Sequence, residues 1–201
     1  MTDMPKREQQ REERRQQILE AALAVFTRKG FNAAKVSDVA AQAGVSQGTI
    51  YWYFDSKEDL LQGALLFFFE NLDQEIASAL EQATTAGGRL RALIQSMAAL
   101  ADEAKELHTL FLEFWASSSR RAEASRLWTE MLRQDKDLVV QIIEAGVQSG
   151  EFRPVDAEAL TWALMAAYDG LAIYLMLMPD LDLERVSRAV TETLLAGLTR
   201  E

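Results

Sequence analysis

A chain of 201 residues with 49% hydrophobic and 26% charged residues has an ordinary globular composition and can bury a sizeable core. It contains no cysteine, which excludes disulfides and thiolate metal sites and suits a reducing cytoplasm. Its net charge of −10 argues against a simple nucleic-acid binder. Residues 1–57, however, carry nine Lys/Arg against seven Asp/Glu, so this mildly basic segment can approach phosphates by itself. The N-terminus is charged and rich in Gln, and we expect no signal peptide.

Apolar residues recur at helical spacing along the whole chain, and no window alternates apolar and polar residues as a strand would. We therefore predict an all-α protein. The predicted helices, about nine in number, span residues 12–29, 36–43, 47–54, 57–82, 87–104, 106–117, 121–149, 155–178 and 182–199. The polar residues 1–11 are expected to form a flexible tail. Ser56, Asp156 and Asp182 precede three of these helices and are expected to cap their first turns.

Residues 36–54 have the spacing of a helix-turn-helix, with two short helices joined at Gly44. Val39 and Ala40 lie on the inner face of the first helix, and Ala40 is small where the two helices would cross closely. Ile50 continues this inner face on the second helix. Ser46 stands where its hydroxyl can accept hydrogen bonds from the free N–H groups of the second helix.

The outer face of that second helix has the residue types that bind DNA. A helix in the major groove reads base edges with its exposed residues, while nearby hydroxyl and ammonium groups hold phosphates. We expect base contacts from Gln47, Gly48, Tyr51 and Trp52. We expect phosphate contacts from Thr49, Tyr53 and Lys57. The alternative is that the three consecutive aromatic residues fill a core, but one face of a short helix cannot bury all three while Ile50 also points inward.

Residues 15–61 resemble the TetR family of bacterial repressors, through the stretch VSDVAAQAGVSQGTIYWYF and the SKEDLL that follows it. The resemblance implies that the same outer-face residues touch bases and backbone. It adds Ser37 as a base contact. Members usually carry Thr or Ser at the cap of the first motif helix, where it contacts a phosphate, and this chain has Lys35 there. Lys35 is expected to replace that phosphate contact by its charge.

The C-terminal part resembles the ligand-binding half of the BetI-type branch of this family, through LFLEFWASSSRR, SGEFRP and AAYDGLAIYLML. We therefore expect two domains. Residues 1–57 would form the helix-turn-helix domain, including a tail over about residues 1–11, and residues 58–201 a ligand-binding and dimerisation domain.

Residues 159–178 are nearly uncharged and long enough to cross a bilayer. Asp169 at their centre would be costly in lipid, and no basic flank marks a cytoplasmic side. We therefore prefer a helix buried on most of its surface, which together with the last helix forms a homodimer interface. Asp169 would then pair across the dimer or present its carboxylate to a ligand, and the sequence leaves both alternatives open.

Large apolar side chains of the middle helices are candidates for an adaptable ligand pocket, although apolar residues at these spacings also fill ordinary cores. The candidates, with the one carboxylate among them, are Phe68, Met97, Phe111, Phe114, Trp115, Trp128, Met131, Trp162, Met165, Tyr168 and Asp169. The single histidine, His108, has no second ligand at helical spacing, so we expect no metal site and no cofactor.

We therefore predict a cytoplasmic, dimeric, ligand-responsive DNA-binding regulator, a repressor released from a palindromic operator by a small apolar or amphipathic effector. One alternative is a helical dimer or adaptor that does not bind DNA. Another is an enzyme, although the sequence contains no nucleophile–base pair, no phosphate-binding Gly-rich loop and no His/carboxylate cluster. The effector, the operator sequence, the regulated genes and the choice between repression and activation cannot be read from the sequence.

Overall fold

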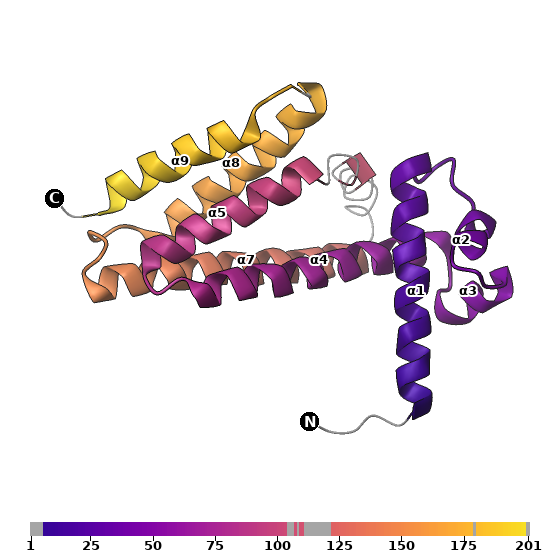
Figure 1. The fold of residues 1–201 in the computed structure, drawn as a ribbon. Coiled ribbons are helices and arrows are strands. Elements are labelled where there is room, and N and C mark those ends of the chain that lie inside the picture. The colour runs from indigo at the N-terminus through magenta and orange to yellow at the C-terminus, as the bar shows by residue number, and fades with distance from the viewer. Residues whose placement is uncertain (1–5, 104–106, 108, 111–121, 179, 200–201) are drawn as a thin grey trace. The chain divides into compact units, whose positions relative to one another are not determined.

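The computed structural model describes residues 6–103, 107, 109–110, 122–178 and 180–199. Throughout this described part the regular elements are helices (Figure 1), which confirms the predicted all-α class. The named helices are α1 (Lys6–Lys29), α2 (Val36–Gln42), α3 (Gln47–Tyr53), α4 (Lys57–Gln82), α5 (Ala86–Glu103), α7 (Ala122–Ser149), α8 (Ala157–Leu177) and α9 (Leu183–Leu198). Most of the predicted helix at 106–117 lies outside the described residues.

The chain divides into two compact units. The first contains the described residues up to Leu72 together with Leu110, and the second contains the remaining residues from Asp73 onward. The long helix α4 contributes its first part to one unit and its last part to the other.

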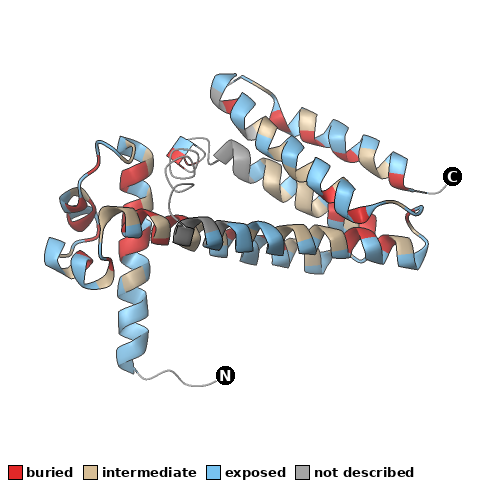
Figure 2. Ribbon diagram, turned by 180° about the vertical axis from the view of Figure 1, so that it is seen from behind, coloured by how far each residue is buried: buried red, intermediate tan, exposed pale blue. Residues whose placement is uncertain are grey.

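In the first unit, α1 packs on α2, and α2 packs on α3. The side chains of Ile18, Phe26, Val39 and Ile50 are almost completely buried between these helices. Burial of apolar side chains of this size stabilises a fold by about 1.5–3 kcal/mol each. Figure 2 shows this core as a buried band in the middle of α1, whereas the first turns of α1 are exposed.

Helix α1 begins at Lys6, six residues before the predicted start. Residues 6–11 lack the apolar spacing that reveals a buried helix face, and all of them are exposed. They consist of Lys, Arg, Glu and Gln, whose intrinsic helix propensity is high and does not depend on burying an apolar face. The helix therefore continues into the segment that we expected to form a tail.

The second unit is a bundle in which α5 packs against both α7 and α9, and α7 packs against α8. Its core contains Leu90 of α5, Ile142 of α7, Phe152 of the α7–α8 connection and Leu198 of α9. The backbone N–H of Arg153 donates to the carbonyl of Leu198 at 2.8 Å, beside an isolated bridge between Phe152 and Thr199. The α7–α8 connection is thereby fixed to the end of α9.

The three predicted helix caps are present. The Ser56 hydroxyl accepts from the N–H of Asp59 at 3.0 Å at the start of α4. The carboxylates of Asp156 and Asp182 accept in the same way from the backbone N–H groups of the third residues of α8 and α9.

The nearly uncharged segment 159–178 lies mostly in α8. None of the helices that the structure describes, α8 included, is long and apolar enough to cross a membrane.

Candidate nucleic-acid interface

The recognition helix α3 is held in place at both ends. Gly44 adopts a φ of +62°, which permits the tight turn between α2 and α3. The Ser46 hydroxyl accepts from the backbone N–H of Thr49 at 3.0 Å and so caps the helix as predicted. Ile50 and Phe54 are 1% and 4% exposed, and they anchor the inner face of α3 in the core of the first unit. The outer face is thereby presented at a defined angle.

The outer face of α3 is open to solvent. Tyr51 and Trp52 are 49% and 64% exposed, Gln47 and Gly48 are exposed, and Tyr53 is half-buried. The three consecutive aromatic residues therefore do not fill a core. Large exposed rings on a short helix are unfavourable unless they have a partner, so this face has the character of a binding surface.

The side chains predicted to hold phosphates already make contacts within the chain. The Thr49 hydroxyl lies 2.8 Å from the Ser46 hydroxyl. The Tyr53 hydroxyl donates to the carbonyl of Arg11 at 3.4 Å. Lys57 is the first residue of α4, and its ammonium lies 4.4 Å from the ring centroid of Phe31. Each of the three polar groups is therefore oriented before any ligand binds.

Lys35 occupies the N-cap position of α2 but does not cap the helix with its side chain. Instead, its backbone N–H donates to the carboxylate of Asp38 at 2.9 Å, and the same carboxylate lies 3.0 Å from the ammonium of Lys29. The hydrogen bond from Lys35, followed by the Lys29 contact, lowers the pKa of Asp38. The side chains of Lys35 and Ser37 are both exposed on this helix.

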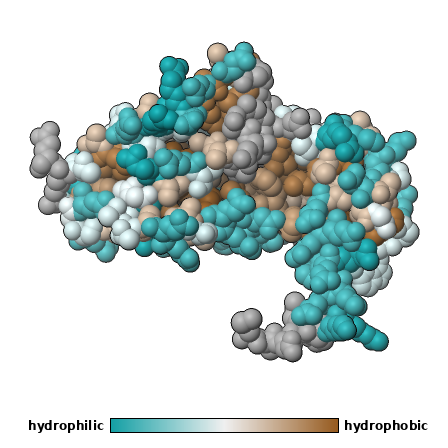
Figure 3. Space-filling model, viewed as in Figure 1, coloured by the Kyte–Doolittle hydropathy of each residue, from teal (hydrophilic) through white to brown (hydrophobic). Residues whose placement is uncertain are grey.

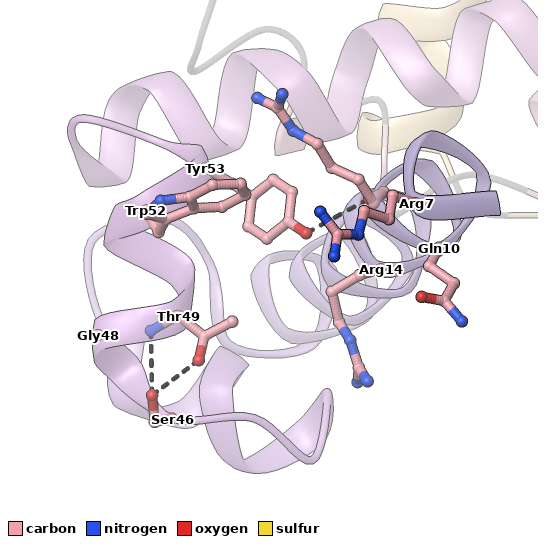
Figure 4. Close-up of a pocket in the computed structure, with 9 residues that line it drawn as sticks. Arg7, Gln10, Arg14, Ser46, Gly48, Thr49, Trp52 and Tyr53 are labelled. Atoms are coloured by element: carbon pink, nitrogen blue, oxygen red, sulfur yellow. Dashed lines mark hydrogen bonds between the residues drawn. The ribbon is translucent and has the colours of Figure 1, made fainter. Parts of the chain in front are cut away.

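Sequence reasoning missed a set of residues on the first turns of α1. Arg7, Gln10, Arg11 and Arg14 line an open hollow of about 700 Å³ together with residues of α3 (Figure 4). The side of the hollow formed by α3 consists of Ser46, Gly48, Thr49, Trp52 and Tyr53. The first turns of α1 have a strongly hydrophilic surface (teal in Figure 3). The spacing of the arginines at i, i+4 and i+7 is the available signal, but Arg7 and Arg11 fall in the expected tail, before the predicted helix that contains Arg14.

The ligand-pocket candidates are scattered. The structure brings two of them together in the second unit, where the Tyr168 hydroxyl donates to the carbonyl of Met97 at 3.3 Å. Burial and then the charge of Asp169 raise the pKa of Tyr168 to about 12. The remaining candidates fall into separate groups. Met131 and Met165 are half-buried in the second unit, Trp162 and Asp169 are exposed, and Phe68 lies edge-on to Phe69 in the first unit.

The other candidates cannot be placed. Phe111, Phe114, Trp115 and His108 lie outside the described residues, and of Trp128 only the backbone in α7 is described. Within the described ranges, no three His, Asp or Glu side chains come together in a way that could hold a metal ion.

An all-helical protein with an anchored helix-turn-helix and an exposed recognition helix is a DNA-binding transcriptional regulator. Residues 18–64 match the family model described as bacterial regulatory proteins, tetR family. Residues 86–199 match the model of the C-terminal part of BetI-type transcriptional repressors. The chain belongs to the TetR family of transcriptional regulators.

Relatives and solved structures agree with this assignment. The transcriptional repressor KstR2 of Rhodococcus jostii is 31% identical over 157 residues, which are 72% of this chain and 71% of that protein. The regulator FadR from Bacillus subtilis, whose crystal structure was solved in complex with stearoyl-CoA, is 28% identical in sequence to this chain. It superimposes with a TM-score of 0.74 over 90% of this chain and 98% of that one. A Saccharomonospora viridis regulator in complex with choline has the same fold, with a TM-score of 0.84 at 23% identity over 94% and 100% of the two chains.

Proposed function

We propose that this regulator is a repressor that binds a palindromic operator as a homodimer and leaves it when a small apolar or amphipathic effector binds. Residues 1–57 would read the DNA in the cytoplasm, and residues 58–201 would dimerise and bind the effector. The observation that carries the proposal is the exposed outer face of α3, which is held rigidly by the Ser46 cap and the buried Ile50.

Base readout is assigned to the exposed residues Gln47, Tyr51 and Trp52, and also to Ser37 on α2. The Gln47 amide can donate to and accept from an adenine in a bidentate contact, and aromatic rings can contact thymine methyl groups. Gly48 has no side chain, so the backbone can approach the floor of the groove closely.

Phosphate binding is assigned to four side chains at the edges of this surface. Thr49 and Tyr53 would turn their hydroxyls from contacts within the chain to the DNA backbone. Lys57 lies at the start of α4, where the free N–H groups of the helix also favour an anion. Lys35 is exposed at the start of α2 and would attract the backbone by its charge.

Dimerisation is supported by an apolar stripe on α8. Trp162, Ile173 and Leu177 recur at helical spacing on one face of α8, and they are 48%, 45% and 73% exposed within the single chain. Val190 of α9 is also exposed. Regulators of this family act as dimers, and a two-fold dimer doubles the DNA contact that one short recognition helix can make. Exposed Asp169 shares the α8 face and would lie in this interface.

An amphipathic effector is supported by the character of the second unit and by the solved relatives. The relative from Bacillus subtilis carries stearoyl-CoA, and the one from Saccharomonospora viridis carries choline. In this chain, the phenol of Tyr168 reaches the backbone carbonyl of Met97, and the half-buried Met97, Met131 and Met165 belong to the same unit. Methionine side chains adapt to irregular apolar ligands. Stearoyl-CoA and choline are therefore the first two probes to test for release of the bound DNA.

A selection experiment tests the proposed function. The wild-type protein is incubated with a random pool of duplexes of roughly 30 base pairs, long enough for two half-sites one helical turn apart. We expect enrichment of an inverted repeat. The Gln47→Ala variant is expected to lose about 1–3 kcal/mol of discrimination at one base of each half-site. The Lys57→Gln variant is expected to bind every sequence more weakly without changing the preferred one. A wild-type protein that enriches no sequence would contradict the proposal.

A further inference from the structure

The first turns of α1 carry opposite charges on different sides of the helix. Arg7, Arg11 and Arg14 recur at i, i+4 and i+7 and therefore form one strip, which we call the arginine strip. The acidic side chains of these turns fall elsewhere around the helix: Glu8, Glu12 and Glu13. Glu12 lies 3.7 Å from Arg15, an i, i+3 pair outside the strip, whereas Arg7, Arg11 and Arg14 lie together on one side of the helix.

The arginine strip faces the recognition helix. All three arginines line the hollow whose other side is α3 (Figure 4). None of the nine described residues that line this hollow is acidic. Arg14 donates to the neutral side-chain oxygen of Gln17 at 2.9 Å. The three arginines thus line the hollow beside α3 together with neutral residues only, an arrangement that attracts an anion.

Two aromatic residues of α3 hold the middle of the strip. The guanidinium of Arg11 lies 4.9 Å from the ring centroid of Trp52, within the range of a cation–π contact. Tyr53 packs edge-on against Trp52 with ring centroids 4.7 Å apart and so supports the indole ring beside Arg11. The end of α3 therefore joins the first turns of α1, and the strip does not project alone into solvent.

We infer that the arginine strip is a second DNA-binding element, which grips the phosphate backbone next to the bases that α3 reads. This inference rests on the proposed function. From Arg7 to Arg14 the helix advances about 10 Å, which equals the rise of about three base pairs along the duplex axis. Arginine suits this position because its planar guanidinium can bind a phosphate in a bidentate manner. Trp52 acts here as a positioning residue for Arg11, while the exposed part of its ring remains able to contact a base.

The test measures how duplex binding depends on salt. Each lost phosphate contact reduces the slope of log K against log salt concentration by about 0.9. The double variant Arg7→Gln/Arg14→Gln is therefore expected to lower that slope by about 1.8 for each bound protomer. At moderate salt it should bind both the selected operator and a random duplex roughly tenfold more weakly or worse. The preferred sequence should not change, because phosphate contacts carry no base information.

The matched control is Arg89→Gln/Arg133→Gln, which removes the same charge from exposed positions in the second unit. We expect its slope to equal that of the wild type. If the arginine-strip variant keeps the wild-type slope as well, the inference is overturned. A wild-type protein that binds no duplex at any salt concentration would instead overturn the proposed function, so the two failures are distinguishable. Because Arg7 and Arg14 are exposed, their replacement should leave the unfolding curve unchanged.

A double-mutant cycle tests the role of Trp52. Arg11→Gln and Trp52→Leu are each expected to reduce the salt slope, and the combined variant should reduce it no further than Arg11→Gln alone. A neutral side chain that only touched bases would not change the slope. An unchanged slope in Trp52→Leu, or additive reductions in the combined variant, would show that Trp52 does not position Arg11.

Discussion

The hydroxyl of Ser46 accepts a hydrogen bond from the backbone N–H of Thr49 at 3.0 Å, and the two side-chain hydroxyls lie 2.8 Å apart. Replacing Ser46 by Ala leaves one more free N–H at the start of α3. We expect the free energy of unfolding to fall by about 1 kcal/mol, measured by urea denaturation. Ser78→Ala, at an exposed position of α4, is the control and should change it little. Equal effects of the two variants would mean that the cap contributes nothing.

Gly44 and Gly48 should respond oppositely to the same change. Gly44 has a φ of +62°, so Gly44→Ala is expected to destabilise the protein by roughly 1 kcal/mol through backbone strain alone. Gly48 is helical, and a Cβ there would meet only the Ser46 hydroxyl at 3.7 Å. Gly48→Ala should therefore stabilise the protein by up to about 1 kcal/mol. It should nevertheless weaken operator binding, because the Cβ enters the space needed by the groove. Unchanged operator affinity in Gly48→Ala would remove Gly48 from the interface.

Glu151 caps α5 from a distant part of the chain. Its carboxylate oxygens accept from the backbone N–H groups of Ala86 and Gly87 at 2.8 and 2.9 Å. We expect Glu151→Gln to lower the free energy of unfolding by about 1–2 kcal/mol, since an amide has one acceptor oxygen and no charge for the helix N-terminus. Glu144→Gln, at an exposed position of α7, is the control. A thermal unfolding curve of Glu151→Gln that overlays the wild-type curve would contradict this role.

The raised pKa of Asp135 should make the stability of the protein depend on pH. Burial and then the charge of Asp73 raise this pKa to about 6. The folded state therefore keeps a proton that the unfolded state releases near pH 4, and this group's contribution to stability falls as the pH rises from about 4 to about 6. Asp135→Asn removes the penalty, so it should stabilise the protein by roughly 1 kcal/mol at pH 7.5 after allowance for solvent screening.

The comparison is made by chemical denaturation at pH 4 and pH 7.5. At pH 4 the Asp135→Asn variant should match the wild type closely. Asp180→Asn, at an exposed position, is the control for removing one carboxylate. A stabilisation by Asp135→Asn that is the same at both pH values would indicate a packing effect rather than a titration.

Local signals in the sequence predicted the helix-turn-helix and most helix boundaries. Gly44, Ser46 and Asp156 each act on backbone groups within three residues, so their roles follow from spacing alone. The start of α1 was wrong because the prediction relied on apolar periodicity, and an exposed helix of Arg, Gln and Glu has none. The same error hid Arg7 and Arg11, which fell in the expected tail, from the predicted site.

Contacts between distant residues could not be read from one sequence. The bond between Glu151 and Gly87 joins residues 64 positions apart, and nothing in the local pattern of either indicates the other. The packing of Arg11 on Trp52 joins two helices in the same way. The cap of α2 is an intermediate case. Asp38 stands three residues after Lys35, a spacing typical of helix starts, whereas the Lys35 side chain has no acceptor oxygen that would indicate a cap.

The most direct test of the central claim is a hydroxyl-radical footprint of the wild-type protein on its selected duplex. Two copies of α3 in consecutive major grooves should protect two segments with centres about 10 base pairs apart, related by the symmetry of the inverted repeat. The Lys57→Gln variant should give the same pattern at a higher protein concentration. A single protected segment, or uniform protection without a pattern, would contradict a dimer that reads DNA through the outer face of α3.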